Sequence, residues 1–186
     1  MPNDIPGWYD WQDLYDRMLS EAEDGAYFVE TGTFFGKSAH HLATNILASG
    51  KRITFDTWDN WSGVPPGFGY PGWLGPEDFS EQLTRRILAN LPVNVYTGDA
   101  ILAAQGYPDA GLDFVFLDDH HGAEHVQNEC TAWWPKIKPG GVLAGHDYDW
   151  PSVFAGVARW AREAGTRVEA VSARCWLVRK PKVDLG

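Results

Sequence analysis

The feature that most constrains the fold is an alternation of short apolar runs with longer segments of helical periodicity. The run from Leu112 to Asp118 is the clearest, because it is apolar almost throughout, as in a parallel strand buried on both faces. Strands that alternate with helices predict an α/β fold with a doubly wound, mostly parallel sheet. The last two runs have the short spacing of a hairpin, which predicts one antiparallel edge strand. The expected strands are residues 26–31, 52–56, 93–97, 112–118, 142–145, 167–172 and 175–179, and the expected helices are residues 10–23, 36–49, 76–89, 123–136 and 152–164, with a short helix after Asp99.

The length of 186 residues is typical of one compact domain, so we interpret residues 1–186 as a single unit. Residues 57–76 interrupt the alternation, since glycines and prolines are interleaved there with tryptophan, tyrosine and phenylalanine. A loop of this length in a small domain is usually functional. The chain also has ten tryptophans, more than a core easily hides. We therefore predict that residues 57–76 form an aromatic lid over a ligand.

Charge and cysteine content limit the partners and the compartment. The chain has 25 acidic and 15 basic residues, so a broad basic surface for nucleic acid or anionic lipid is not expected. Its two cysteines form no disulfide framework, which favours a reducing compartment. The first residues lack the blocks of a signal peptide, and no run approaches the ~20 apolar residues of a membrane span. We expect a cytoplasmic protein that binds neither nucleic acid nor membrane.

Acidic residues lie at or just after nearly every predicted strand. Ligands of such sheets bind beyond the carboxyl ends of the strands, so these acids predict one common site. Helix capping and turn formation also favour aspartate, and that alternative stays open for each residue. The acids are Glu30, Asp56, Asp99, Asp118 and Asp147.

The glycine-containing segment Val29–Ser38 can be interpreted in three ways. A phosphate-binding loop needs four residues between its glycines, whereas three separate Gly32 from Gly36. A dinucleotide-binding loop needs the pattern GxGxxG, which fails directly after Gly32. The third interpretation is a loop for S-adenosylmethionine, with an acid two residues before the first glycine.

This third interpretation is the most specific. The pattern Glu30-x-Gly32-x-x-x-Gly36-x-Ser38 resembles the cofactor loop of class I S-adenosylmethionine-dependent methyltransferases of the catechol O-methyltransferase type. Later motifs resemble the small-molecule O-methyltransferases that include macrolide-sugar O-methyltransferases. The resemblance covers residues 8–180 and implies a Rossmann-like, seven-stranded sheet with strand order 3-2-1-4-5-7-6. The later motifs are Phe114–Asp118, His121, Glu124, Trp134, Lys138–Gly141 and Gly145–Tyr148.

The resemblance implies roles for residues on the cofactor side. The two glycines would let the backbone approach the methionine part of the cofactor, and Ser38 would offer its hydroxyl to the carboxylate. Asp56 would accept hydrogen bonds from both ribose hydroxyls, as the two oxygens of a carboxylate can. Trp58 would cover the adenine, and Asp99 would accept from its amino group. The expected cofactor residues are Glu30, Gly32, Phe34, Gly36, Ser38, Asp56, Trp58, Gly98, Asp99 and Asp118.

Asp118, His146 and Asp147 form a second group. The families that the chain resembles bind magnesium at the matching positions, so these residues imply a divalent metal (Mg²⁺ or Mn²⁺) that activates the acceptor. His146 departs from the pattern, because those families usually have an oxygen ligand there and imidazole suits Mn²⁺ better than Mg²⁺. A capping role without any metal is the alternative.

His121 lies three residues after Asp118, where the catechol-type enzymes have a lysine that acts as base. The resemblance therefore implies His121 as general base beside Asp118, and an imidazole pKa of about 6.5 suits that role. A structural histidine in the first turn of a helix is the alternative. The same stretch, His121-Gly-Ala-Glu-His125, also spells an inverted zinc-protease motif, which needs a further, distant glutamate ligand.

Together these features predict methyl transfer from S-adenosylmethionine to a small-molecule acceptor. We expect a hydroxyl on a sugar or polyol-like compound, with proximity and alignment supplying most of the catalysis. The alternative is a non-catalytic protein that binds S-adenosylmethionine, or that assembles with partners, on the same fold. In that case the aromatic segment 57–76 would matter more than the cofactor loop.

Overall fold

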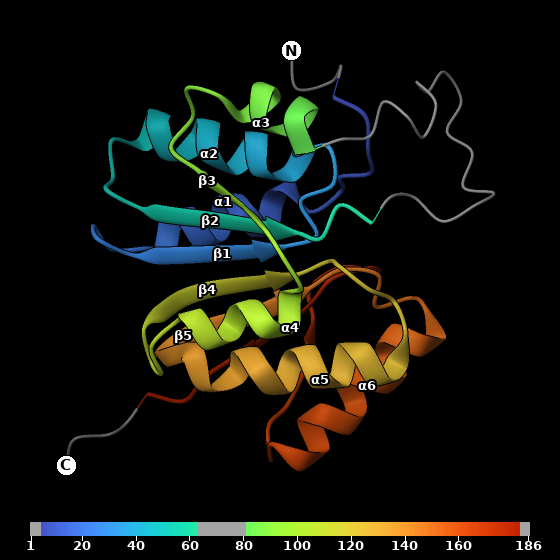
Figure 1. The fold of residues 1–186 in the computed structure, drawn as a ribbon. Coiled ribbons are helices and arrows are strands. Elements are labelled where there is room, and N and C mark those ends of the chain that lie inside the picture. The colour runs from blue at the N-terminus through green and yellow to red at the C-terminus, as the bar shows by residue number, and fades with distance from the viewer. Residues whose placement is uncertain (1–4, 63–80, 183–186) are drawn as a thin grey trace.

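A computed structural model describes residues 5–62 and 81–182. Its centre is a seven-stranded sheet surrounded by helices (Figure 1). The strands are β1 Tyr27–Thr31, β2 Thr54–Asp59, β3 Asn94–Thr97, β4 Leu112–Leu117, β5 Ile137–Gly145, β6 Glu169–Ala170 and β7 Trp176–Arg179. The helices are α1 Gln12–Glu21, α2 Lys37–Ser49, α3 Glu81–Leu88, α4 Ala100–Ala103, α5 Ala123–Trp133 and α6 Pro151–Glu163.

The order of the strands is β3-β2-β1-β4-β5-β7-β6, which confirms the predicted fold class and strand order. The strands from β3 to β5 in this order are parallel, whereas β7 is antiparallel to both β5 and β6. The antiparallel strand therefore lies one place in from the edge. The edge itself is the two-residue strand β6, which exposes few unpaired backbone groups.

The sheet separates two hydrophobic cores. Because side chains alternate along a strand, Phe114 and Phe116 of β4 pack with α1 and α2, and Val115 and Leu117 pack with α5 and α6. This explains why the sequence of β4 is apolar throughout: both of its faces are buried. A sheet covered on both sides leaves only its strand ends for a ligand.

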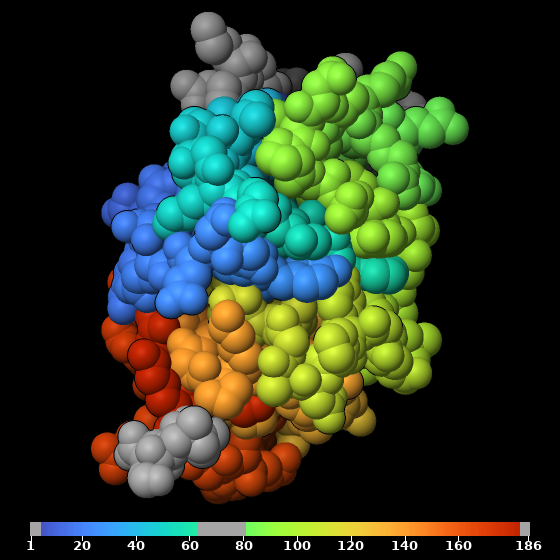
Figure 2. All heavy atoms as spheres, turned by 90° about the vertical axis from the view of Figure 1, so that its left-hand side faces the viewer, coloured from blue at the N-terminus to red at the C-terminus, as the bar shows by residue number. Residues whose placement is uncertain are grey.

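The carboxyl ends of the parallel strands lie on one side of the molecule. Figure 1 shows the arrowheads of β1, β2 and β4 pointing to that side. Figure 2 shows the opposite side, where segments from the start, the middle and the end of the chain meet. The functional site is therefore to be sought at the arrowheads.

One boundary differs from its prediction in a way that affects the site. Strand β2 does not end at Asp56 but continues to Asp59, because Trp58 pairs with Thr31 of β1 and Asp59 pairs with Thr97 of β3. The predicted lid over residues 57–76 thus begins inside β2. Its residues 63–76 lie outside the described part of the chain.

Candidate active site

The glycines of the loop after β1 allow this loop to pass close to the backbone at the end of β4. Gly32 has a φ of +83°, and a Cβ there would lie 2.0 Å from the backbone oxygen of Asp118 at the end of β4. Gly36 has a φ of +79° and is the residue from which α2 begins. The loop after β1 can therefore pass directly over the end of β4, which brings the predicted cofactor loop next to the second group of acids.

Glu30 lies beneath this loop and does not line the cavity. Its carboxylate accepts hydrogen bonds from the Tyr15 hydroxyl (2.6 Å) and the Thr57 hydroxyl (2.9 Å), and Ser38 donates to it as well. Burial raises the pKa of Glu30 to about 7, and the three donors oppose that shift. Glu30 thus fixes the loop from below, whereas Ser38 also lines the cavity above it.

Asp56 is not at the strand end, and its predicted placement is wrong. The side chain is buried in mid-strand and accepts hydrogen bonds from Tyr27 (2.5 Å), Tyr107 (2.8 Å) and Asn94 (2.8 Å). Three protein donors thus hold this buried carboxylate within the fold. The prediction failed because it ended the strand too early.

Asp59 occupies the position that was expected for Asp56. It is the last residue of β2, it lines the cavity, and its Oδ2 accepts a hydrogen bond from the backbone N–H of Phe34 in the first loop (2.7 Å). Oδ1 accepts from the backbone N–H of Trp61 (2.8 Å), and burial raises the pKa of the carboxyl. The sequence held a signal for this residue, since Asp59-Asn60 is a turn-forming pair at which a strand can end.

Trp58, Gly98 and Asp99 all lie outside the lining of the cavity. The Trp58 ring stacks on Tyr96 at 4.7 Å, and its N–H donates to the Tyr107 hydroxyl (2.8 Å). A Cβ at Gly98 would meet the Trp58 ring at 3.2 Å, so this glycine makes room for the tryptophan. Asp99 caps α4 by accepting from the backbone N–H groups of two residues in its first turn. All three therefore have structural roles here.

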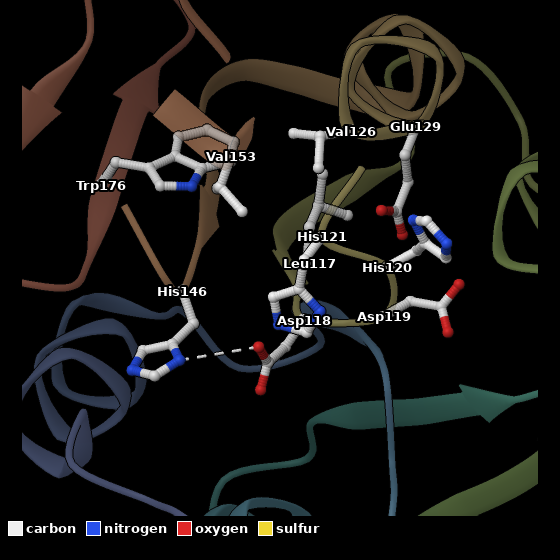
Figure 3. A pocket seen from close by; sticks show the side chains of 10 residues that line it. All are labelled: Leu117, Asp118, Asp119, His120, His121, Val126, Glu129, His146, Val153 and Trp176. Carbon is white, nitrogen blue, oxygen red and sulfur yellow. Dashed lines mark ion pairs between the residues drawn. The ribbon is translucent and has the colours of Figure 1, made fainter. Parts of the chain in front are cut away.

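The second group comes together at the ends of β4 and β5. His121 Nε2 is hydrogen-bonded to Asp147 Oδ2 at 2.6 Å. His146 Nδ1 lies 3.2 Å from Asp147 Oδ1 and 3.6 Å from Asp118 Oδ1, and Figure 3 shows His146 facing Asp118. The sequence prediction that these four residues share one site is thus reflected in their geometry.

The charges in this group support one another. The hydrogen bond to Asp147 raises the pKa of His121. Burial acts to lower the pKa of His146, but Asp118 and Asp147 outweigh it and raise that pKa to about 10. Burial acts to raise the pKa of Asp147, yet hydrogen bonds from both histidines hold it well below its usual range. At neutral pH the group therefore contains an imidazolium at His146 and a carboxylate at Asp147.

Among the described residues, two groups of side chains could hold a metal ion, and neither is the predicted set of Asp118, His146 and Asp147. Ligand atoms of Asp118, His121 and Asp147 lie within 4.8 Å of one another. His146, which was predicted as the third ligand, has its Nε2 2.9 Å from Asp10 Oδ1 and belongs to the other group, with Asp10 and Cys175. His121 joins Asp118 and Asp147 in the group at the cavity, and the predicted role of His146 as a metal ligand stays a prediction. Two carboxylates and one imidazole suit Mn²⁺ or a similar divalent ion.

A cavity of about 660 Å³ joins the two groups. Gly32, Ser38 and Asp59 line it on the side of the first loop, and His121 and Asp147 line it on the other. A smaller pocket of about 20 Å³, large enough for one water, is lined by Asp118, His121 and His146 of the second group (Figure 3). Of the predicted cofactor residues, Gly32, Phe34, Ser38 and Asp118 line this cavity, and its size is one that small-molecule sites have.

Sequence reasoning missed the part of this cavity that the N-terminal segment forms. Trp8, Asp10 and Trp11 precede the first predicted strand, and their pattern indicates only the start of a helix. In the structure Trp8 and Trp11 line the cavity, and the Trp11 ring lies 4.3 Å from that of His146. Trp150 lines the cavity at the end of the loop after β5, and its ring is 4.8 Å from that of His121. The ten tryptophans were the only sequence signal for these positions.

A family comparison matches most of this site. Residues 29–148, from the middle of β1 into the loop after β5, match the family described as a methyltransferase domain. The match covers more than half of the chain. The chain belongs to this methyltransferase family. S-adenosylmethionine is the cofactor expected for it.

Solved structures with the same fold as this methyltransferase include several O-methyltransferases. The O-methyltransferase NovP superposes with a TM-score of 0.72 at 17% identity, over 92% of this chain and 79% of that chain. CalS11, a calicheamicin methyltransferase, superposes with a TM-score of 0.64 at 14% identity, over 90% of this chain and 76% of that chain. An S-adenosylmethionine-dependent O-methyltransferase from Thermotoga maritima superposes with a TM-score of 0.65 at 16% identity, over 96% of this chain and 69% of that chain. A search of curated proteins finds no match.

Two remaining expectations concern zinc and membranes. The inverted zinc-protease pattern is not assembled in this methyltransferase, since His121 pairs with Asp147 whereas His125 lies 3.5 Å from Asp119 and Glu124 is exposed. Among the described residues, no helix has both the length and the apolar character needed to cross a membrane.

Proposed function

We propose that this methyltransferase transfers the methyl group of S-adenosylmethionine to a hydroxyl of a small, carbohydrate-like acceptor. The observation that carries the proposal is the His121–Asp147 hydrogen bond of 2.6 Å in the cavity that the Gly32 loop also lines. A base held by a carboxylate and placed beside a cofactor loop is the arrangement that deprotonation of an acceptor requires.

The residues on the first side fit the cofactor. Ser38 lies in the first turn of α2, where free N–H groups and the helix dipole favour a carboxylate. Asp59 replaces Asp56 as the acid for the ribose hydroxyls, because it alone of the two lines the cavity. Asp59 accepts a hydrogen bond from the backbone N–H of Phe34, which keeps the Asp59 carboxylate turned toward the loop. The bound cofactor supplies the electrophilic methyl group.

His121 is the base in this proposal. Asp147 holds Nε2, which leaves Nδ1 to take the proton, and the carboxylate stabilises the imidazolium that results. As the acceptor O–H proton moves to His121, the oxygen lone pair forms a bond to the methyl carbon. The carbon–sulfur bond breaks, and its electron pair stays on sulfur, which gives S-adenosylhomocysteine. Alignment of these atoms supplies most of the rate.

A divalent metal is the second candidate for activating the acceptor. Asp118, His121 and Asp147 would hold it, and when bound it would lower the pKa of the acceptor hydroxyl. We propose the base as the main route, so activity should survive treatment with a chelator. Loss of activity on chelation, with recovery in Mn²⁺, would mean that the metal activates the acceptor hydroxyl.

Two features support a carbohydrate-like acceptor. CalS11 is described as a TDP-rhamnose 3'-O-methyltransferase. In this chain Trp8 and Trp150 are 52% and 39% exposed, and both line the cavity, where flat indole faces can cover a sugar ring. The lid predicted over residues 57–76 would close on the same acceptor.

The test is a screen of sugars and polyols with methyl-labelled S-adenosylmethionine, run beside calorimetry with S-adenosylhomocysteine. We expect cofactor binding together with label transfer to at least one acceptor. Cofactor binding without transfer to any acceptor would favour the non-catalytic alternative. Lack of binding by the wild-type protein would contradict the proposal as a whole.

A further inference from the structure

Arg174 is a cation in the cavity that the proposed reaction does not use. It lies in the turn between β6 and β7, and the Ser172 hydroxyl accepts hydrogen bonds from the backbone N–H groups of Arg174 (3.2 Å) and Cys175 (2.9 Å). Its own carbonyl accepts from the backbone N–H of Tyr148 (2.9 Å). The backbone of Arg174 is therefore fixed against the loop that follows β5, while its side chain lines the cavity.

The guanidinium has charged neighbours but no hydrogen bond to a described residue. Arg174 Nη1 lies 3.5 Å from Asp10 Oδ2, and Nε lies 3.4 Å from Asp149 Oδ2. Both distances exceed the 2.7–3.2 Å typical of a hydrogen bond from N–H to oxygen. Nearly half of the side chain, 46%, is exposed. Its donors are thus oriented by two carboxylates and still open to a ligand.

The negative charge of Asp10 is already shared. Its other oxygen, Oδ1, lies 2.9 Å from Nε2 of His146, so Asp10 has a second partner besides Arg174. Lys37 is the only lysine among the described residues that line the cavity, and its ammonium donates to the carbonyl of Gly7 (3.0 Å). Arg174 is therefore the cation of the cavity that is best placed to receive an additional anion.

We propose that Arg174 binds an anionic oxygen group, a carboxylate or a phosphate, on the acceptor. This inference rests on the proposed function and narrows its acceptor from neutral sugars to sugar acids or sugar phosphates. The fork of a guanidinium matches the paired oxygens of either group, and such charge-assisted bonds are short and strong. Arg174 and the His121–Asp147 pair line one cavity, so one acceptor molecule can present its anion to Arg174 and its hydroxyl to His121.

The competing explanation is a structural one, in which Arg174 only braces Asp10 and Asp149. The two explanations differ in what removal of the charge does. Loss of a brace would impair every acceptor alike. Loss of an anion site would impair only acceptors that carry the anion and would leave their neutral analogues unchanged.

The experiment compares matched acceptors with labelled S-adenosylmethionine. A methyl glucuronide is paired with the methyl glucoside, and a hexose phosphate is paired with the free hexose. The proteins are wild type, Arg174→Gln, Arg174→Lys and the control Arg167→Gln, which removes one positive charge at an exposed position before β6 that does not line the cavity. Affinity for S-adenosylhomocysteine is measured on each preparation.

In wild type and in Arg167→Gln, the charged member of at least one pair should have the lower KM. In Arg174→Gln its KM should rise about tenfold to a hundredfold, the scale of a charged hydrogen bond, while that of its neutral partner stays the same. Arg174→Lys should recover part of the loss. The pair that responds identifies the anion as carboxylate or phosphate.

Equal loss for charged and neutral acceptors in Arg174→Gln would overturn the inference in favour of the brace. Transfer only to neutral acceptors would overturn it as well, and so would failure of every charged acceptor in a protein that binds S-adenosylhomocysteine. Those results would leave the proposed methyl transfer standing. Failure to bind S-adenosylhomocysteine at all would count against the proposed function itself.

Discussion

The two sides of the cavity are built in different ways. On the cofactor side, Gly32 and Ser38 come from one short segment, and Asp59 ends the neighbouring strand. On the acceptor side, the lining comes from four separate parts of the chain: the N-terminal segment, the loops after β4 and β5, and the turn at Arg174. A local motif can specify the first side, whereas only tertiary contacts assemble the second.

The largest effect should follow a change on the acceptor side. His121→Ala removes the proposed base and should lower the rate of methyl transfer by ~10²–10⁴. Affinity for S-adenosylhomocysteine should stay the same, because the first loop is untouched. Steady-state kinetics and calorimetry on the same protein measure both quantities. An unchanged rate would remove His121 from the mechanism.

The next effect concerns the acid at the end of β2. Asp59→Ala should weaken binding of S-adenosylhomocysteine by about 1.5–3 kcal/mol, because a carboxylate that accepts from hydroxyl groups is lost. Asp59→Asn keeps the size of the side chain and should lose less. Calorimetry at one pH gives the comparison. Wild-type affinity in both variants would mean that the ribose lies elsewhere.

Asp56 provides the matched contrast on the same strand. Asp56→Ala leaves the Tyr27, Tyr107 and Asn94 donors without their acceptor, so the free energy of unfolding should fall by about 1–3 kcal/mol or more. Affinity for S-adenosylhomocysteine should be unchanged in the folded fraction. Urea unfolding and calorimetry separate the two effects. A loss of affinity without a loss of stability would restore Asp56 as a cofactor residue.

The smallest effect is a shift in the pH profile. The hydrogen bond to Asp147 raises the pKa of His121, and a base works only when deprotonated, so the rate should increase as pH rises through that pKa. Asp147→Asn removes the carboxylate, which should move this acid limb to lower pH and reduce the plateau. Profiles of kcat/KM for the two proteins measure the shift. An acid limb that does not move would show that Asp147 does not set the pKa of the catalytic base.

These contrasts also explain what the sequence could predict. Gly32 and Gly36 were recognisable because a positive φ and a close approach of two backbone segments both require glycine. The local sequence is therefore enough to identify this loop. Asp118, His146 and Asp147 were found because they lie at the ends of predicted strands, and His121 because it lies three residues after Asp118, where the family that the chain resembles has a base. Their pairing was not predictable, since nothing in the sequence tells that Asp10 holds His146 or that His121 turns to Asp147.

Asp56 illustrates the opposite case. Its spacing from the glycines suited a ribose acid, and only the pairing of β2 with β1 and β3 shows that the strand continues to Asp59. Strand ends are set by pairing with the neighbouring strand, which the sequence of one strand does not contain. Because the strand ends three residues later than predicted, the Asp56 side chain lies in a buried hydrogen-bond network and not in the cavity.

A crystal structure of the protein with S-adenosylhomocysteine tests the central claim most directly. We expect the ribose hydroxyls within about 3.2 Å of the Asp59 carboxylate, the methionine carboxylate at the start of α2 beside Ser38, and the sulfur facing His121 across the cavity. A ligand that lies outside the cavity, or a ribose bound at Asp56, would contradict the account.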